Sequence, residues 1–116
     1  MGQLQTLSVD DLQDLTPRGA RDLVVRCFHD AQKETLQRAA STLGAAPSDE
    51  QLRRTVEGAV RLAFRAAQAD YEAPTKPALA GVVAALAAKA AAMGTPMDII
   101  EHHRTQLGRI FAALPD

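Results

Sequence analysis

The sequence contains no tryptophan and has only one cysteine, one tyrosine and three phenylalanines among its 116 residues. A single cysteine cannot form an internal disulfide, which is typical of proteins in a reducing, cytoplasmic setting. Aromatic side chains of the kind that stack on single-stranded nucleic acid are scarce. Neither sign of charge dominates, since 13 basic and 14 acidic residues give a net charge of -1. This balance argues against a strongly basic nucleic-acid-binding protein.

The sequence also has no hydrophobic run suited to a membrane. Its most apolar stretch, residues 77–93, contains Lys89 and consists mainly of alanine, which contributes little transfer free energy. Residues 1–14 are polar and acidic, unlike a secretory signal. We therefore expect one cytoplasmic domain over residues 1–116, without membrane insertion.

Alanine makes up for a modest supply of large apolar residues. Leucine, isoleucine, valine and phenylalanine together number 26, whereas alanine alone occupies 23 positions. Burial stabilises by about 25 cal/mol per Å² of apolar surface, so a buried alanine adds little. Such a core requires closely approaching backbones, and a second subunit would supply the burial that one chain lacks.

Clear start and stop signals divide the chain into helices. Pro17 stands at a favoured first helical position, and Gly44 is suited to the left-handed end of a helix. The expected N-terminal caps are Ser8, Thr16, Ser48, Thr75 and Thr95. With apolar residues at helical spacing, they predict helices at about 17–43, 48–72, 77–93 and 96–114, after a short N-terminal helix or arm in 1–15. The predicted fold is all-α, an antiparallel four-helix bundle with a short extra N-terminal helix.

The helix predicted at 77–93 differs from the others because it is apolar around most of its circumference. Such a helix is typical of a central position or of an oligomer interface. Its small residues recur at every fourth position, a spacing that allows two backbones to approach closely. The predicted interface residues are Ala80, Ala84, Ala85 and Ala88.

Histidine and cysteine are the first candidates for chemistry. His102 and His103 are adjacent on a helix and point about 100° apart, so they cannot both reach one metal ion without distortion of the helix. His103 shares the apolar stripe of the last helix, and we expect it to be buried and neutral. Cys27 lies on the apolar stripe of the first long helix and is expected to be a small buried hydrophobe. Weak candidates for metal or ligand binding are His29, His102, His103 and Cys27.

Arginines of the helix predicted at 48–72 are the second candidates. Arg54, Arg61 and Arg65 share one sector of that helix. Glu50 precedes Arg54 by four residues, and Glu57 precedes Arg61 by four, which is the favourable order for ion pairs on a solvated helix face. An anion-binding or nucleic-acid-binding surface is the functional alternative.

Motifs of the common enzymes are missing. The sequence has no glycine-rich phosphate loop, no G-x-S-x-G, no C-x-x-C and no Glu-x-x-His pair of the di-iron bundles. We therefore expect no catalysis and no cofactor. The main hypothesis is a homodimeric helical protein that acts through protein–protein contact. A ligand- or metal-binding bundle is the alternative, and anion or nucleic-acid binding the third.

Overall fold

The computed structural model describes residues 6–44 and 48–115. All regular secondary structure in these residues is helical, which confirms the all-α prediction. The predicted connection at 45–47 and the first residues of the predicted N-terminal arm, 1–5, lie outside the described residues. The helices are α1 (Val9–Leu12), α2 (Pro17–Leu43), α3 (Asp49–Ala66), α4 (Lys76–Ala92) and α5 (Met97–Ala113).

Four of the five predicted N-terminal caps are confirmed. The side chains of Ser8, Thr16, Ser48 and Thr75 each accept a hydrogen bond from the backbone N–H of the third residue after them. These bonds satisfy donors that have no partner within the helix. Gly44 ends α2 with a left-handed φ of 82°, which confirms the predicted stop.

The predicted extent of the helix at 48–72 is wrong at its C-terminus, because α3 ends at Ala66. Gln68 adopts a left-handed φ of 53°, and the N–H of Ala69 donates to the Phe64 carbonyl at 2.9 Å. This is a Schellman ending, whose left-handed position is usually taken by glycine. Glutamine at this position gives no stop signal in the sequence.

The prediction that Thr95 caps the last helix is also wrong. Pro96 is the residue before α5, which has no side-chain cap. The left-handed Gly94 turns the chain so that Thr95 is buried, and its Oγ1 lies 3.3 Å from Gln32 Nε2 and 3.4 Å from Thr35 Oγ1. Thr95 therefore joins the end of α4 to α2 instead of capping α5.

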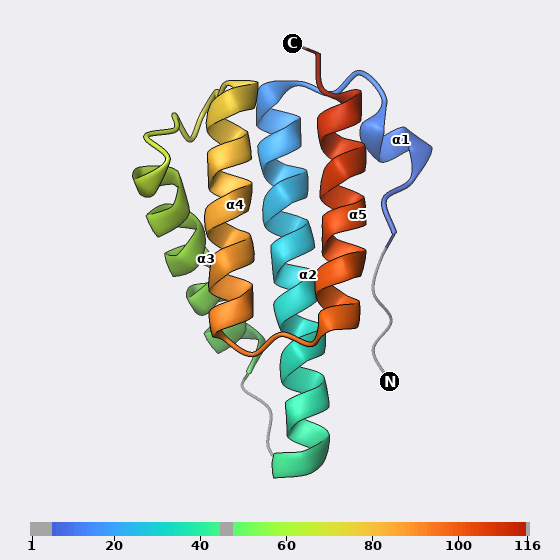
Figure 1. Cartoon of the computed structure of the whole chain (residues 1–116), viewed down its shortest axis with the longest axis vertical. Helices are drawn as coiled ribbons and strands as arrows, with labels where there is room; N and C mark the ends of the chain where they lie inside the picture. The colour runs from blue at the N-terminus through green and yellow to red at the C-terminus, as the bar shows by residue number, and fades with distance from the viewer. Residues whose placement is uncertain (1–5, 45–47, 116) are drawn as a thin grey trace.

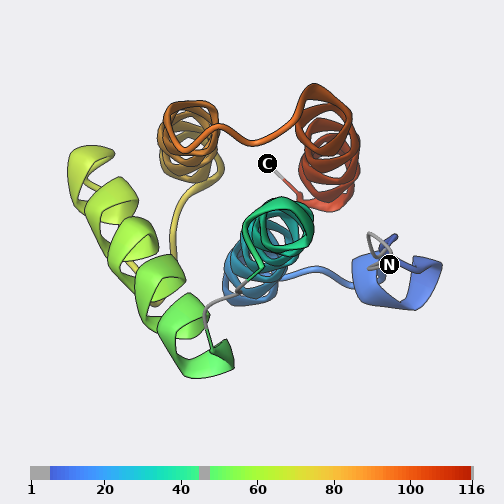
Figure 2. The same ribbon diagram turned by 90° about the horizontal axis from the view of Figure 1, so that it is seen from below.

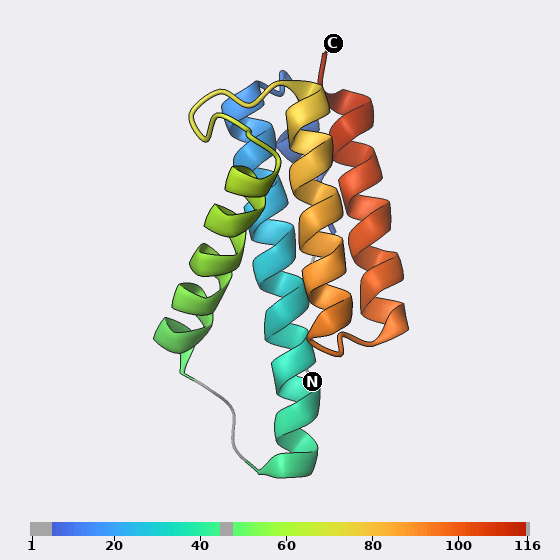
Figure 3. The same cartoon turned by 60° about the vertical axis from the view of Figure 1, so that its left-hand side comes forward.

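The long helices form two tightly packed pairs. Successive long helices run in opposite directions (Figure 1), and the most extensive contacts are those of α3 with α4 and of α2 with α5. Seen from below, α3 and α5 lie on opposite sides of the molecule, and α3 is inclined to the other long helices (Figure 2). The inclination of α3 is also visible from the side (Figure 3). Contacts of α4 with α2 and α5 are fewer.

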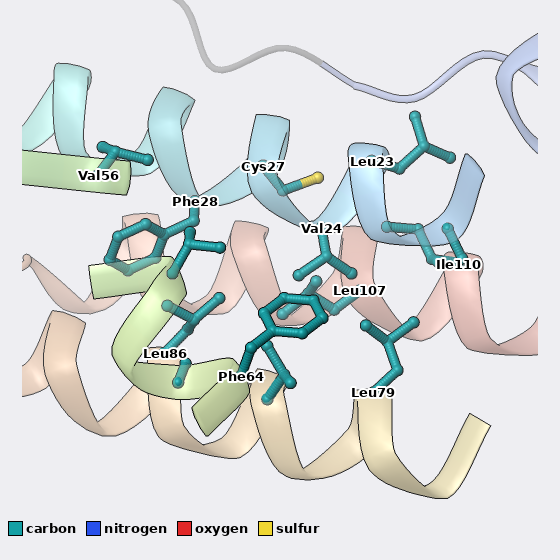
Figure 4. Packing of buried hydrophobic residues seen from close by; sticks show 14 of the residues in the cluster. Leu23, Val24, Cys27, Phe28, Val56, Phe64, Leu79, Leu86, Leu107 and Ile110 are labelled. Atoms are coloured by element: carbon teal, nitrogen blue, oxygen red, sulfur yellow. The ribbon is translucent and has the colours of Figure 1, made fainter. Parts of the chain in front are cut away.

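The core lies between the two pairs. Phe28 of α2 and Phe64 of α3 project among residues of α2 and α4 such as Val24, Leu79 and Leu86 (Figure 4). On α4 the buried residues form a single stripe of Leu79, Val82, Leu86 and Ala90. The opposite side of α4 is exposed alanine and glycine. None of the described helices is long and apolar enough to cross a membrane.

The segment before α1 is fastened to α5. The backbone N–H of Leu7 donates to Gln106 Oε1 at 2.9 Å, and the Leu7 carbonyl accepts from Arg109 Nη1 at 2.6 Å. Leu7 itself is buried. These contacts hold the short helix α1 beside α5 (Figure 1), although a helix of this length has little stability alone.

We predict that Thr95→Val destabilises the protein by about 1–3 kcal/mol, because the buried Nε2 of Gln32 loses its hydrogen-bond acceptor. Urea unfolding monitored by circular dichroism measures the change in the free energy of unfolding. The double variant Thr95→Val/Gln32→Met replaces both partners by apolar groups, and we expect it to recover most of the loss. Equal losses in the single and double variants would contradict the role of this hydrogen bond.

Candidate functional site

An apolar groove of about 280 Å³ runs between α4 and α5. Small residues from both helices contribute to it, flanked by larger apolar side chains. It is lined by Val83, Ala84, Ala87 and Ala90 of α4 and by Ile100, His103, Arg104, Leu107, Gly108 and Phe111 of α5. The groove opens between α4 and α5, which contact each other less extensively than α2 contacts α5 or α3 contacts α4.

The residues predicted for an interface fall at different places on α4. Ala84 is exposed and lines the groove. Ala80 and Ala88 are exposed on the same helix outside the groove lining, and Ala85 is half-buried against the core. The α5 side of the groove was not expected from the sequence, because several of its residues, such as His103 and Leu107, belong to the apolar stripe of the last helix, which predicts burial inside the chain.

Gly108 is the sequence signal that could have revealed the α5 side. Glycine within a helix costs about 1 kcal/mol relative to alanine. A Cβ atom added at Gly108 would meet nothing within 4 Å, so no contact with the described residues requires glycine there. Together with Arg104 and Phe111, Gly108 shares one helix face by its spacing.

His103 lies between the groove and a smaller cleft that faces α2. Its side chain is 6% exposed, and its Nε2 atom is buried without a hydrogen-bond partner among the described residues. Burial, together with a smaller effect of the neighbouring His102, lowers the pKa of His103 to about 4. The expectation of a buried histidine on the apolar stripe is confirmed, and the ring is neutral at pH 7.

The cleft between α2 and α5 brings together three of the four metal-site candidates. Cys27, His102 and His103 line it with Asp30, whereas His29 is not among its lining residues. Its volume of about 10 Å³ holds about one water molecule at most. No three His, Cys, Asp or Glu side chains in the described part of the chain are placed to hold one metal ion.

Cys27 is a buried thiol, as expected from its place on the apolar stripe. Burial raises the pKa of this thiol to about 11, and the Asp30 carboxylate adds to the shift. The thiolate is the nucleophilic form of cysteine. Cys27 is therefore protonated and unreactive at neutral pH.

The three candidate arginines separate into two environments. Arg54 pairs with Glu50 at 3.0 Å, as predicted. The predicted pair of Glu57 with Arg61 is not formed within the described residues. Instead, Arg61 and Arg65 line a pocket of about 470 Å³ between α2 and α3, and Arg54 lies outside it.

Comparison with known proteins gives no match to a protein-family model, a curated protein or a solved structure. The function must therefore be argued from the residues themselves. The polar residues that line the α4–α5 groove are the neutral His103 and Arg104. The Nη1 atom of Arg104 lies 3.5 Å from Glu101 Oε1. Such a lining suits apolar contact with another molecule.

We predict that His103 makes the protein less stable in mild acid. Between pH 6.5 and about 4 the unfolded chain binds a proton at this ring and the folded chain does not, so stability falls as the pH is lowered through this range, by about 3 kcal/mol in total. NMR titration of the ring should give a pKa near 4. Urea unfolding at several pH values measures how the free energy of unfolding changes with pH.

The variant His103→Gln should lose this part of the pH dependence, and His29→Gln should keep it. The carboxylates titrate in the wild type and in both variants. The difference between the wild type and His103→Gln in how the free energy of unfolding depends on pH therefore isolates His103. A His103 ring that titrates at 6.5 or above would show that it is not buried and neutral.

Proposed function

We propose that this chain is a non-catalytic helical protein that acts through protein–protein contact and forms a homodimer at the α4–α5 groove. The observation that carries the proposal is the groove itself, where Ala84 and Ala87 of α4 and Gly108 of α5 are exposed and are not covered by any of the described residues. Small residues at such positions allow another helix to approach closely.

A second copy of the chain is the occupant that we propose, because the groove and the exposed alanine side of α4 are both apolar and belong to the same molecule.

The shape of α4 also supports a second copy. Its exposed side carries Ala80, Ala84 and Ala88 at four-residue spacing, so α4 of one subunit can enter the groove of the other. Two-fold symmetry would make this contact twice, as an interface formed by the same residues on both subunits. Lys89 is exposed and would remain at the edge, because burial of an unpaired ammonium is costly.

Two finer descriptions belong to the same proposal. We class the fold as an irregular antiparallel four-helix bundle, since the long helices alternate in direction (Figure 1) and α3 is inclined to the rest (Figure 2). We also propose a cytoplasmic location, which the presence of a single cysteine supports.

We predict that light scattering at micromolar concentration gives a mass twice the 12.4 kDa of the chain. The variant Gly108→Leu should be monomeric, because leucine would fill the groove that the partner helix occupies. Its fold should be no less stable, since leucine favours the helix by up to about 1 kcal/mol over glycine and Gly108 has open space around it.

Gly58→Leu is the matched control. Gly58 of α3 is also exposed with nothing within 4 Å of an added Cβ, but it lies outside the groove, so this variant should remain dimeric. A wild-type mass of 12.4 kDa would refute the dimer, and a dimeric Gly108→Leu would refute its location.

We further predict that Ala84→Glu weakens the dimer at least tenfold, because the interface would bury an unpaired carboxylate. Ala39→Glu on the exposed side of α2 adds the same charge away from the groove and should leave the dimer intact. Sedimentation equilibrium of both variants measures the dissociation constants. Similar constants for the two variants would contradict an interface at Ala84.

A further inference from the structure

The pocket between α2 and α3 combines an apolar wall with charged groups. Val25 of α2, Val60 and Phe64 of α3 and Tyr71 of the following loop form its apolar side, and its volume is about 470 Å³. The charged lining residues are Glu57, Arg61 and Arg65. Pockets of this size are typical of sites for small organic ligands.

The guanidinium groups of Arg61 and Arg65 form no ion pair with the described carboxylates. Neither has a carboxylate within ion-pair distance in the described part of the chain, whereas Arg18, Arg38 and Arg54 pair with carboxylates at 2.6, 2.7 and 3.0 Å. Residues four apart on a helix are surface neighbours. Both guanidinium groups can therefore reach one anion, and each would donate charge-assisted hydrogen bonds.

The aromatic wall is held in place before any ligand arrives. Arg21 is buried, and its Nη1 donates to the Tyr71 carbonyl at 2.7 Å. The guanidinium carbon of Arg21 lies 4.2 Å from the centre of the Tyr71 ring. Its Nη2 donates to Asp22 Oδ1 at 2.9 Å. The edge-to-face contact of Tyr71 with Phe64, with centroids 5.1 Å apart, fixes the ring from another side. A preorganised wall lowers the entropic cost of binding.

The charge of the lining selects the class of ligand. Two arginines and one glutamate leave a single net positive charge, which matches a monoanion better than a dianion. We propose that this pocket binds a small aromatic monoanion of the aryl-carboxylate class. Its carboxylate bonds to Arg61 and Arg65, and its ring packs against Phe64, Tyr71 and the valines. The pocket lies between α2 and α3 and the groove between α4 and α5, so ligand binding and dimer formation are separate properties.

Calorimetric titration with 2-naphthoate tests the proposal on the full chain. We expect saturable binding of one molecule per chain, with 2-naphthol and acetate at least tenfold weaker, because each offers only the ring or only the charge. Amide NMR shifts induced by 2-naphthoate should centre on Val25, Val60 and Phe64.

Charge-removing variants assign the contacts. Arg61→Gln and Arg65→Gln should each weaken 2-naphthoate binding about tenfold, whereas Glu57→Gln should strengthen it by removing the negative charge of the lining. Arg53→Gln is the matched control, because Arg53 is exposed on the same helix outside this pocket. All four side chains are exposed, so we expect each variant to fold, which circular dichroism checks.

Four results would overturn the proposal. They are the absence of saturable 2-naphthoate binding at millimolar concentration, equal binding of 2-naphthol, equal affinity of the Arg61→Gln and Arg53→Gln variants, and amide shifts centred on the α4–α5 groove. Light scattering of the same samples measures the dimer independently. A wrong dimer proposal is therefore distinguished from a wrong proposal of ligand binding in this pocket.

Discussion

The contact between two helix pairs is the constraint on which the rest of this structure depends. α2 packs closely on α5 and α3 packs closely on α4, and the two pairs are joined through the core, where large side chains such as Phe28, Phe64 and Leu86 meet. Most of the stability of a helix in a protein comes from the packing of its apolar face. The pairs therefore persist because these side chains are removed from water between them.

Both candidate surfaces follow from this construction, because each lies where one pair meets the other. The α4–α5 groove and the α2–α3 pocket are each formed by one helix from either pair. Their chemistry differs because the contributing helices differ. α4 presents alanine, so the groove is apolar, whereas α3 carries arginine and glutamate beside its buried stripe.

Polar side chains inside the protein are concentrated along the α2–α5 pair. Gln32 meets Thr95, His103 lies against Phe28 with ring centroids 6.3 Å apart, and Gln106 accepts from the Leu7 backbone. Buried polar groups are costly unless they find partners. The contacts of Gln32 with Thr95 and of Phe28 with His103 favour one alignment of α5 on α2, whereas the Gln106 bond fixes the segment before α1 on α5.

The sequence by itself determined the helical class, most helix starts and the buried stripes, because caps and helical spacing act over three or four residues. It also indicated the burial of His103 and Cys27. Only the tertiary structure decided that α3 stops at Ala66, that Thr95 bonds across 63 residues to Gln32, and that Arg61 and Arg65 share a pocket with Tyr71. These outcomes depend on which helices pack together, and packing is decided by side chains far apart in the chain, whose meeting no local pattern records.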